Sequence, residues 1–496
     1  MDHQAQGSPA PPLVLAIDIG SSSVRTALYD ARATLLTATV ARAPSGFRIA
    51  ADGTAEDDPR LLFERVVQCL DATLDAAGAL QMPIVAVACA TYVTSLLGVD
   101  AAGEPITPIY TYADTRGAHA ADALRAQLDE AQVLQRTGCP LRTSYYPALL
   151  HWLRATDPEL MRRVARWQSI GAWLYERLLG RWCTSLSAAA WTGLLNRWTC
   201  AWDAELLTLL GIDAAQLGPL VDVDEALNGL RAPWAARWPA LAQARWFPAI
   251  GDGAAANLGS GCIDPRAVAL SVGTSGALRV LLPHEPQIPA GLWCYRLDRV
   301  HPLLGSATSE GGNVLDWARR VLGLSAEAID AWLLDPAGAR HHLTVLPFVA
   351  GERGPEWGGA SWATISGITS DTTPLDLARA LIEGVTYRWA LIAERLRPWL
   401  AEAPLVIGSG GALQRLPTWG QVIADALNLP VTISPYPETT MRGAVMLALR
   451  NLGLIQRFED LLVWPEPIYR PDRERHAAHR EALARQRRLY QQLQTA

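Results

Sequence analysis

Two short turns in the sequence combine small residues with hydroxyl groups and lie between apolar, strand-like segments. The first, Gly20-Ser21-Ser22-Ser23, follows an apolar run that carries Asp18 between Ile17 and Ile19, and the second is Gly273-Thr274-Ser275-Gly276. Backbone amides and hydroxyls in such turns can hold phosphate oxygens. A buried carboxylate needs compensation, and one at a strand end suits Mg²⁺, which rarely sheds all its water. The pattern predicts two phosphate-binding turns, with Asp18 as a metal ligand.

A third segment, GDGAAANLGSG, places Asp252 between two glycines and ahead of a run of small residues. Two interpretations stay open. Asp252 is either the cap of a helix that begins there, or a general base that takes a proton from a hydroxyl attacking a phosphate.

The elements that must position these residues follow from the hydrophobic pattern. Apolar alternation predicts strands on either side of the first turn, a third strand over 33–42, a helix over 58–80 and a buried strand over 83–93. Helical segments dominate 118–241, and a second strand–turn–strand unit covers 267–282. One such turn is by itself more often an ordinary hairpin. Two of them, one in each half of the chain, favour phosphate binding.

Composition limits the classes of function. The 496 residues predict two large domains, and the net charge of −6 gives no reason to expect nucleic-acid or membrane binding. The sequence contains no lysine, which excludes a Walker A lysine and a Schiff-base lysine. The seven scattered cysteines are expected to be reduced, and the first residues show no secretory pattern, so we expect a cytoplasmic protein.

Five segments in order resemble the FGGY carbohydrate kinases. AIDIGSSSVRTALYD and SVGTSGALR look like the two phosphate motifs, and GDGAAANLGSG looks like the segment with the catalytic aspartate. ATISGITSDTTPLDLARALIEG is similar to the C-terminal signature, and GSGGALQRLPTWGQVIADALNLPV to the adenosine segment. Within the family the likeness is greatest to the gluconate kinase branch, through EGGNVLDWARR and LPFVAGERGPEW.

The resemblance implies an α/β protein in which two domains of actin-like, ribonuclease-H-like fold flank a catalytic cleft. We expect a disordered lead-in over 1–12, a sugar-side domain over 13–255, a nucleotide-side domain over 256–470 and a helical tail over 471–496. The implied reaction transfers phosphate from ATP, with Mg²⁺, to a small sugar, sugar acid or polyol. The implied site residues are Asp252 as the base, Asp18 for the metal, Gly20, Ser21, Ser22, Ser23, Gly273, Thr274, Ser275, Gly410, Gly411 and Ala412 for the nucleotide, and Thr94, Tyr112, Asp114, Arg116 and Tyr145 for the substrate.

Several positions depart from the family pattern. Val93-Thr94 stands where the family usually has Met-His, and Tyr112 replaces a tryptophan. Leu149 replaces a lysine, Leu416 a serine and Glu310 an asparagine-like residue. The nucleotide machinery therefore looks intact, whereas the sugar pocket looks altered.

Several alternatives stay open. Asp114 and Arg116 either bind substrate or pair with each other, and Arg25 is either an auxiliary cation or a solvent-facing residue. Glu352 and Arg353 are read as an internal ion pair, and Trp191 and the other central tryptophans as core. The substrate is a gluconate-like sugar acid, or a pentulose or polyol. A silent sugar sensor and a chaperone-like or filament-forming ATPase are other classes, and a homodimer is one assembly to test.

Overall fold

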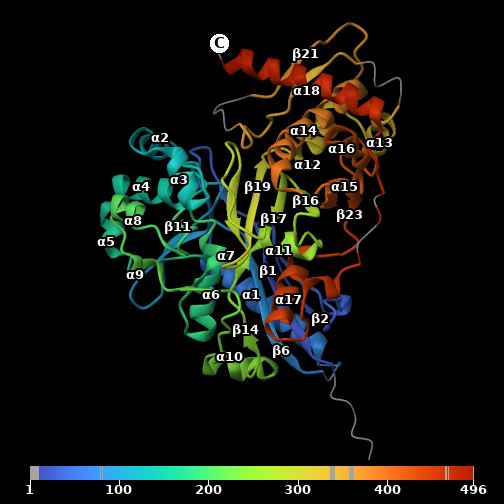
Figure 1. The fold of residues 1–496 in the computed structure, drawn as a ribbon. Coiled ribbons are helices and arrows are strands. Elements are labelled where there is room, and N and C mark those ends of the chain that lie inside the picture. Colours follow the sequence, from blue (N-terminus) through green and yellow to red (C-terminus); the bar gives the residue numbers. More distant parts are fainter. Residues whose placement is uncertain are drawn as a thin grey trace, which may run out of the picture. The chain divides into compact units, whose positions relative to one another are not determined.

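The computed structural model describes residues 11–494 except 79, 81, 336–340, 357–361, 464, 465 and 467. Residues 1–10 of the predicted lead-in therefore lie outside the described residues. The chain divides into two compact units (Figure 1). The first contains Met1–Gly259, Tyr295–Pro302 and Tyr436–Val463, and the second contains Ser260–Cys294, Leu303–Pro435 and Trp464–Ala496.

The central sheet of the first unit has the strand order β14-β6-β1-β2-β3, with β15 also paired to β6. Its strands are β1 (Leu13–Ile19), β2 (Ser23–Tyr29), β3 (Ala41–Pro44), β6 (Ile84–Thr91), β14 (Arg245–Trp246) and β15 (Ile250–Gly251). β1 and β2 form the predicted antiparallel hairpin, and β6 runs parallel to β1. The sequence pattern predicts the third strand over 33–42, but β3 covers only Ala41–Pro44, because Thr37–Thr39 form a 3-10 turn (η1) in which the Thr39 hydroxyl accepts a hydrogen bond from the amide of Leu28.

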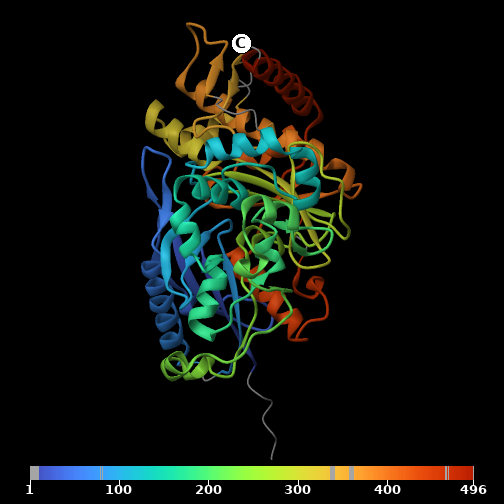
Figure 2. The ribbon, with the colours of Figure 1, turned by 90° about the vertical axis from the view of Figure 1, so that its left-hand side faces the viewer.

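Neighbouring residues of β2 show which helices cover the two faces of this sheet. The Thr26 hydroxyl bonds to Cys69 and Thr73 of α1 (Pro59–Ala77), whereas Arg25 pairs with Glu438 at the start of α17 (Thr439–Asn451). Because successive side chains of a strand point to opposite faces, α1 and α17 cover opposite sides of the sheet. Figure 2 shows the ribbon turned by 90° about the vertical axis from the view of Figure 1.

A smaller sheet and a set of short helices complete the first unit. The sheet has the order β4-β5-β8-β7-β9, from β4 (Arg48–Ile49), β5 (Ala55–Asp57), β7 (Leu96–Val99), β8 (Pro105–Tyr110) and β9 (Arg166–Gln168). The helices predicted over 118–241 are α2 (Ala118–Gln127), α3 (Glu130–Thr137), α4 (Tyr146–Thr156), α5 (Pro158–Arg163), α6 (Ile170–Leu179), α7 (Leu186–Ala189), α8 (Ala204–Leu210), α9 (Ala214–Leu217), α10 (Ala232–Arg237) and the 3-10 turn η2 (Pro239–Leu241). Short strand pairs lie among them: β10 (Thr184–Ser185) with β13 (Leu220–Val221), and β11 (Leu195–Asn196) with β12 (Ala201–Trp202).

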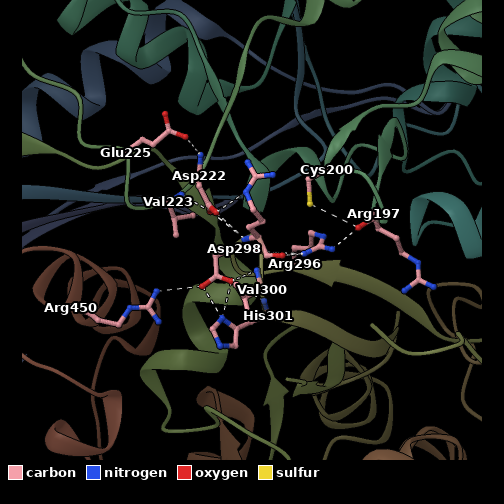
Figure 3. Close-up of polar contacts among 11 residues, drawn as sticks. Arg197, Cys200, Asp222, Val223, Glu225, Arg296, Asp298, Val300, His301 and Arg450 are labelled. Carbon is pink, nitrogen blue, oxygen red and sulfur yellow. Dashed lines mark hydrogen bonds and ion pairs between the residues drawn. The ribbon is translucent and has the colours of Figure 1, made fainter. Parts of the chain in front are cut away.

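Polar contacts hold Tyr295–Pro302 in the first unit (Figure 3). The Asp298 carboxylate bonds to His301 Nδ1 at 2.8 Å and pairs with Arg450 of α17 at 3.4 Å. Arg296 donates to the carbonyl of Arg197, and the Arg299 amide donates to Asp222. Burial would raise the pKa of Asp298, but its bonds to His301 outweigh that and lower the pKa to about 2. This network fixes the segment that carries Tyr295.

The second unit is built on a sheet that contains β19-β17-β16-β22-β23 in hydrogen-bonded order. Its strands are β16 (Ala267–Val272), β17 (Gly276–Leu281), β19 (Pro302–Thr308), β22 (Leu405–Ser409) and β23 (Val431–Ile433), and β18 (Trp293–Arg296) spans the point where the chain returns to the first unit. β16 and β17 form the second predicted hairpin. Its other elements are α12 (Gly312–Leu322), α13 (Ala326–Leu333), β20 (Thr344–Leu346), β21 (Thr364–Ser366), α14 (Pro374–Leu396), η4 (Arg397–Trp399), α15 (Gly411–Arg415), α16 (Trp419–Leu427) and α18 (Arg473–Gln494), whereas α11 (Asp252–Gly259) and η5 (Phe458–Leu461) belong to the first unit.

The predicted helical tail is α18, and one of its faces packs on the second unit. Gln486 is buried and donates to the carbonyls of Val345 and Gly384, and Arg475 pairs with Asp425 of α16 at 2.6 Å. α18 therefore contributes to the core of this unit. Among the described residues, we find no helix with the length and apolar character needed to span a bilayer.

Candidate active site

Asp18 and Asp252 lie at the same edge of the first unit's central sheet. In the parallel strands β1, β6 and β15, Asp18 is in register with Ala90, and Ala90 with Ile250, so Asp252 follows just past the end of β15. The carboxyl ends of parallel strands meet at one edge, a common place for binding sites in α/β folds. Three segments far apart in sequence thus bring two carboxylates together.

Asp18 is almost fully buried and has an arginine as its cross-strand partner. Arg25 lies opposite Asp18 in the β1–β2 register, and its guanidinium pairs with the Asp18 carboxylate at 2.5 Å. Burial raises the pKa of Asp18 to about 7; Arg25 opposes this rise, whereas the negative charges of Asp252 and Glu438 add to it. A cation beyond Arg25 would therefore be stabilised at this carboxylate.

The structure identifies a residue that the sequence pattern did not single out. Glu438 lies just before α17. Its carboxylate pairs with the guanidinium of Arg25, which also pairs with Asp18. Its backbone adopts φ = 51°, in the left-handed region that non-glycine residues rarely occupy. Arg25 is thus held between two carboxylates from opposite ends of the chain, and its own side chain is 25% exposed.

Asp252 begins α11 and accepts a hydrogen bond from the amide of Gly253 at 2.7 Å. This contact satisfies one amide at the start of α11, which is part of what a helix cap does, and the proximity of Asp252 to Asp18 fits the interpretation as a general base. The two roles use different lone pairs of the same carboxylate and are compatible. α11 crosses α17 at very short range, because a Cβ on Gly443 would lie 1.9 Å from the carbonyl oxygen of Ala255.

Aromatic side chains line the surroundings of Gly251, the residue before Asp252. A Cβ on Gly251 would lie 2.6 Å from Trp191 Nε1 and 2.9 Å from Val93. Trp191 stacks on Tyr295 with ring centroids 3.7 Å apart, and the Tyr295 hydroxyl lies 2.5 Å from that of Tyr145. Tyr145 thus connects to the Asp252 region through Tyr295, which no sequence pattern indicates, and Trp191, which the sequence pattern predicts to be a core residue.

Thr94 is buried and has a strained backbone. It adopts φ = 56°, which is unfavourable for a β-branched residue, and its hydroxyl donates to the carbonyl of Val93 at 2.7 Å. Strain of this kind is typical of functional sites. Tyr112 is half-buried and makes edge contacts with Phe47 and Tyr92.

Asp114 and Arg116 pair with each other, one of the two possibilities left open by the sequence. Arg116 Nη2 lies 2.6 Å from Asp114 and 2.6 Å from Glu56, and its guanidinium lies 4.8 Å from the ring of Trp152. Asp114 is fully buried. Two carboxylates thus already neutralise Arg116.

In the second unit, three glycine-rich segments lie together. The amides of Gly312 and Asn313, which begin α12, donate to the carbonyls of Gly273 and Thr274 at 2.7 and 3.1 Å. A Cβ on Gly312 would lie 3.0 Å from Ala412, and one on Gly410 would lie 2.3 Å from the carbonyl oxygen of Val272. The Gly311-Gly312 pair of the EGGNVLDWARR segment therefore lies beside the Gly273–Gly276 turn and the Gly410-Gly411 segment.

Several of the residues predicted to bind nucleotide are exposed, whereas Ser23 and Ala412 are buried. Gly273, Thr274 and Ser275 are exposed, and nothing lies within 4 Å of a Cβ built on Gly411. Gly276 is buried, and a Cβ there would lie 2.4 Å from Trp389 Nε1. The turn thus rests on an indole and offers its hydroxyls outward.

The departures from the family pattern are mostly buried. Leu149 and Leu416 lie in the hydrophobic interior, and at Leu149 the lysine usual in the family would be costly to bury. Glu310 is also buried, and this burial raises its pKa to about 7. Glu352 pairs with Arg388 at 2.7 Å and accepts from Tyr490, so the expected Glu352–Arg353 pair is replaced by a contact between the GERGP segment and α14.

Mg²⁺ is compatible with these residues. Among the described residues, no group of three or more His, Cys, Asp or Glu side chains could form a complete metal cage. Mg²⁺ is commonly held by one or two carboxylates together with water and substrate phosphates. Asp18, whose carboxylate is destabilised by burial, fits that use.

Comparison with known proteins agrees with the geometry. Models of the N-terminal and C-terminal domains of the FGGY family of carbohydrate kinases match residues 13–259 and 268–452. A gluconokinase of Bacillus licheniformis is 26% identical, over 90% of this chain and 89% of the relative. Crystal structures of a gluconate kinase and a xylulose kinase from Lactobacillus acidophilus superpose with TM-scores of 0.90 and 0.89, each at 26% identity; they cover 98% and 97% of this chain and 99% and 98% of theirs.

Proposed function

The chain belongs to the FGGY family of carbohydrate kinases and is a sugar phosphotransferase of the two-domain, actin-like fold, and we propose that it uses Mg-ATP with Asp252 as general base. The observation that carries this proposal is the placement of Asp252 and Asp18 at one edge of the sheet, with Arg25 between Asp18 and Glu438. A carboxylate base and a charge-neutralising group are the parts that phosphoryl transfer to a hydroxyl requires.

In the proposed reaction, the Asp252 carboxylate takes the proton of the attacking sugar hydroxyl. The sugar oxygen forms a bond to the γ-phosphorus, the bond between that phosphorus and the β,γ-bridging oxygen breaks, and ADP leaves with the bonding electrons. Asp18 is the residue that would hold Mg²⁺ through water, and the ion would supply positive charge to neutralise the phosphates. Arg25 of β2 places a positive charge next to Asp18 of β1, with which it forms an ion pair.

The second unit supplies the nucleotide-binding groups in this proposal. The amides and hydroxyls of Thr274 and Ser275 bind phosphate oxygens, while the Gly273 amide closes the turn by donating to the Ser275 carbonyl at 3.0 Å, and the open space beside Gly411 accepts the adenosine. Because these donors are fixed by the Gly276–Trp389 contact and by α12, little reorganisation is needed when charge develops.

The altered pocket favours a neutral acceptor as a second candidate beside gluconate. Gluconate is an anion, and the imidazole usual in the family could carry a positive charge, whereas Thr94 offers only a hydroxyl. Arg116 is already neutralised by Asp114 and Glu56. A pentulose or polyol therefore joins gluconate as the acceptor to test, with the ring of Tyr295 or Trp191 as a stacking surface.

A coupled ADP-release assay tests the proposal with gluconate, xylulose, ribulose, glycerol and erythritol. We expect Asp252→Asn to lower kcat for the best acceptor by about 10²- to 10⁴-fold, the usual contribution of a general base, with little change in ATP affinity. Asp75→Asn, on the exposed side of α1, is the matched control and should be fully active. Normal turnover by Asp252→Asn would refute the base assignment, and no acceptor-stimulated turnover by the wild type across a wide panel would favour the sensor.

A further inference from the structure

The second unit contains a cavity of about 460 Å³ that none of the glycine-rich segments lines. It lies where α18 passes α14 and α16, beside the end of α13 (Figure 1). Its charged and polar lining consists of His341, His342, Arg379, Glu383, Tyr387, Arg475, His479, Glu481 and Arg485. A volume of this size is typical of sites for small organic molecules.

The buried carboxylate of this cavity is already saturated with donors. Glu383 Oε1 accepts from Arg379 Nε at 2.8 Å, and Oε2 lies 3.1 Å from His341 Nε2 and 3.3 Å from the Tyr387 hydroxyl. Burial would raise the pKa of Glu383, but its contacts with His341, His479 and Arg379 outweigh that and lower the pKa to about 2. Glu383 is therefore ionised and balances one positive charge of the lining.

Two of the three arginines in the lining are already paired, Arg379 with Glu383 and Arg475 with Asp425, and Glu481 is exposed. Arg485 forms no ion pair with the described residues, and its Nε is buried without a hydrogen-bond partner there. Nδ1 of His341 is likewise buried without a hydrogen-bond partner among the described residues, and its side chain is 10% exposed. Buried polar atoms without partners are uncommon in folded proteins and call for a ligand or water.

The polar residues that α18 contributes to the cavity share one face of the helix. Arg475, His479 and Arg485 follow a spacing of four and then six residues, and Ala478 and Ala482 lie between them. Residues three and four apart are neighbours on a helix surface, so the alanines leave room over which the longer side chains converge. Charge, free donors and space thus coincide.

We propose that this cavity binds a small phosphate-bearing molecule, through Arg485 and the imidazole of His341, at a site separate from the nucleotide turns. The planar guanidinium fork of Arg485 matches two oxygens of a phosphate group, and Nδ1 of His341 is a further buried ring nitrogen at the cavity that has no hydrogen-bond partner among the described residues. The ligand bridges the segment just before β20, which carries His341, and α18, which carries Arg485.

Calorimetry with inorganic phosphate, glycerol 3-phosphate and gluconate on the full chain tests the site, with and without saturating ADP. We expect phosphate or its ester to bind while ADP is present and gluconate to bind more weakly. Arg485→Gln should weaken phosphate binding about tenfold, the loss of one charge-assisted bond. Arg480→Gln, exposed on the same helix, is the matched control and should bind like the wild type.

The outcomes separate this site from the active site. Full displacement of phosphate by ADP would overturn the proposal, because the probe would then occupy the nucleotide turns. Binding by Arg485→Gln equal to that of the wild type would also overturn it. His341→Asn is a second variant that should also bind phosphate more weakly than the wild type. These binding measurements do not depend on the phosphotransfer assay of Asp252→Asn, so either proposal can fail without the other.

Discussion

Replacing Gly443 by alanine tests the contact between α11 and α17, the helices that begin next to Asp252 and Glu438. The added Cβ would lie 1.9 Å from the carbonyl oxygen of Ala255, whereas ordinary contact begins at 3.4 Å. The Cβ would thus be about 1.5 Å too close to this oxygen. Because the oxygen belongs to the backbone, it cannot rotate away as the end of a side chain can. The reciprocal contact is equally short, because a Cβ on Gly259 would lie 1.8 Å from the carbonyl oxygen of Thr439.

Two effects of opposite sign decide the size of the change. Alanine is a better helix former than glycine by about 1 kcal/mol, which favours the variant. Overpacking a well-packed contact costs about 1–3 kcal/mol, and the upper end applies because both helices must separate. We therefore expect a net loss of about 2 kcal/mol in unfolding free energy, or a fall in Tm of roughly 4–8 °C for a unit of this size.

Calorimetric unfolding and steady-state kinetics of Gly443→Ala measure the effect. Because the separation displaces both Asp252 and Glu438, kcat should fall as well, at a temperature where the variant is still folded. Gly78→Ala is the control, since Gly78 ends α1 with φ = −54° and its Cβ would meet only an ordinary 3.4 Å contact. If calorimetry gives Gly443→Ala a Tm within 1 °C of that of the wild type, then the close contact between α11 and α17 does not limit stability, and the prediction is refuted.

Three further predictions concern single contacts. Glu438→Gln removes one of the two carboxylates that hold Arg25, so kcat should fall about tenfold with little change in the KM for sugar, and unchanged steady-state kinetics would contradict a positioning role. Thr94→Asn relieves a left-handed backbone that asparagine tolerates better, so Tm should rise with a gain of about 1 kcal/mol while the sugar KM increases; a lower Tm would show that φ is not strained. The folded pKa of Glu383, about 2, lies below its ordinary value of 4.5, so its stabilisation is complete above pH 5 and is lost as pH falls toward 2. Urea titrations should show the gap between wild type and Glu383→Gln shrinking by roughly 1 kcal/mol at pH 3.5, and a constant gap would exclude this linkage.

The local parts of the fold could be predicted because they depend on neighbouring residues. The two hairpins, α1, β6 and the helix at the end of the chain follow from apolar periodicity and turn residues. The 3-10 turn at Thr37–Thr39 could not, because it depends on a hydroxyl of Thr39 bonding to Leu28 in place of a strand partner. A run of β-branched residues is therefore a weak indicator when side chains compete for the backbone.

The site was predictable in its motifs but not in its long-range contacts. The hydroxyls and amides of the turns are recognisable from composition alone, and the family resemblance supplied roles for Asp18 and Asp252. The pairing of Arg25 with Glu438 joins residues 413 positions apart, and no local pattern records it. Tyr295 and Trp191 likewise come together only through tertiary packing, because an aromatic residue in the core and one beside a ligand have the same local sequence signature.

The return of α17 to the first unit has a consequence for how the protein is made. When the ribosome has passed Gly259, the surface of β1 and β6 that α17 later covers is still bare, and the closing segment ends only at Val463. At ordinary elongation rates of about 5–20 residues per second, roughly 200 further residues take about 10–40 s. The apolar face of that sheet is exposed to solvent throughout this interval. A premature stop before residue 436 would release a first unit that lacks α17, the helix that covers this face.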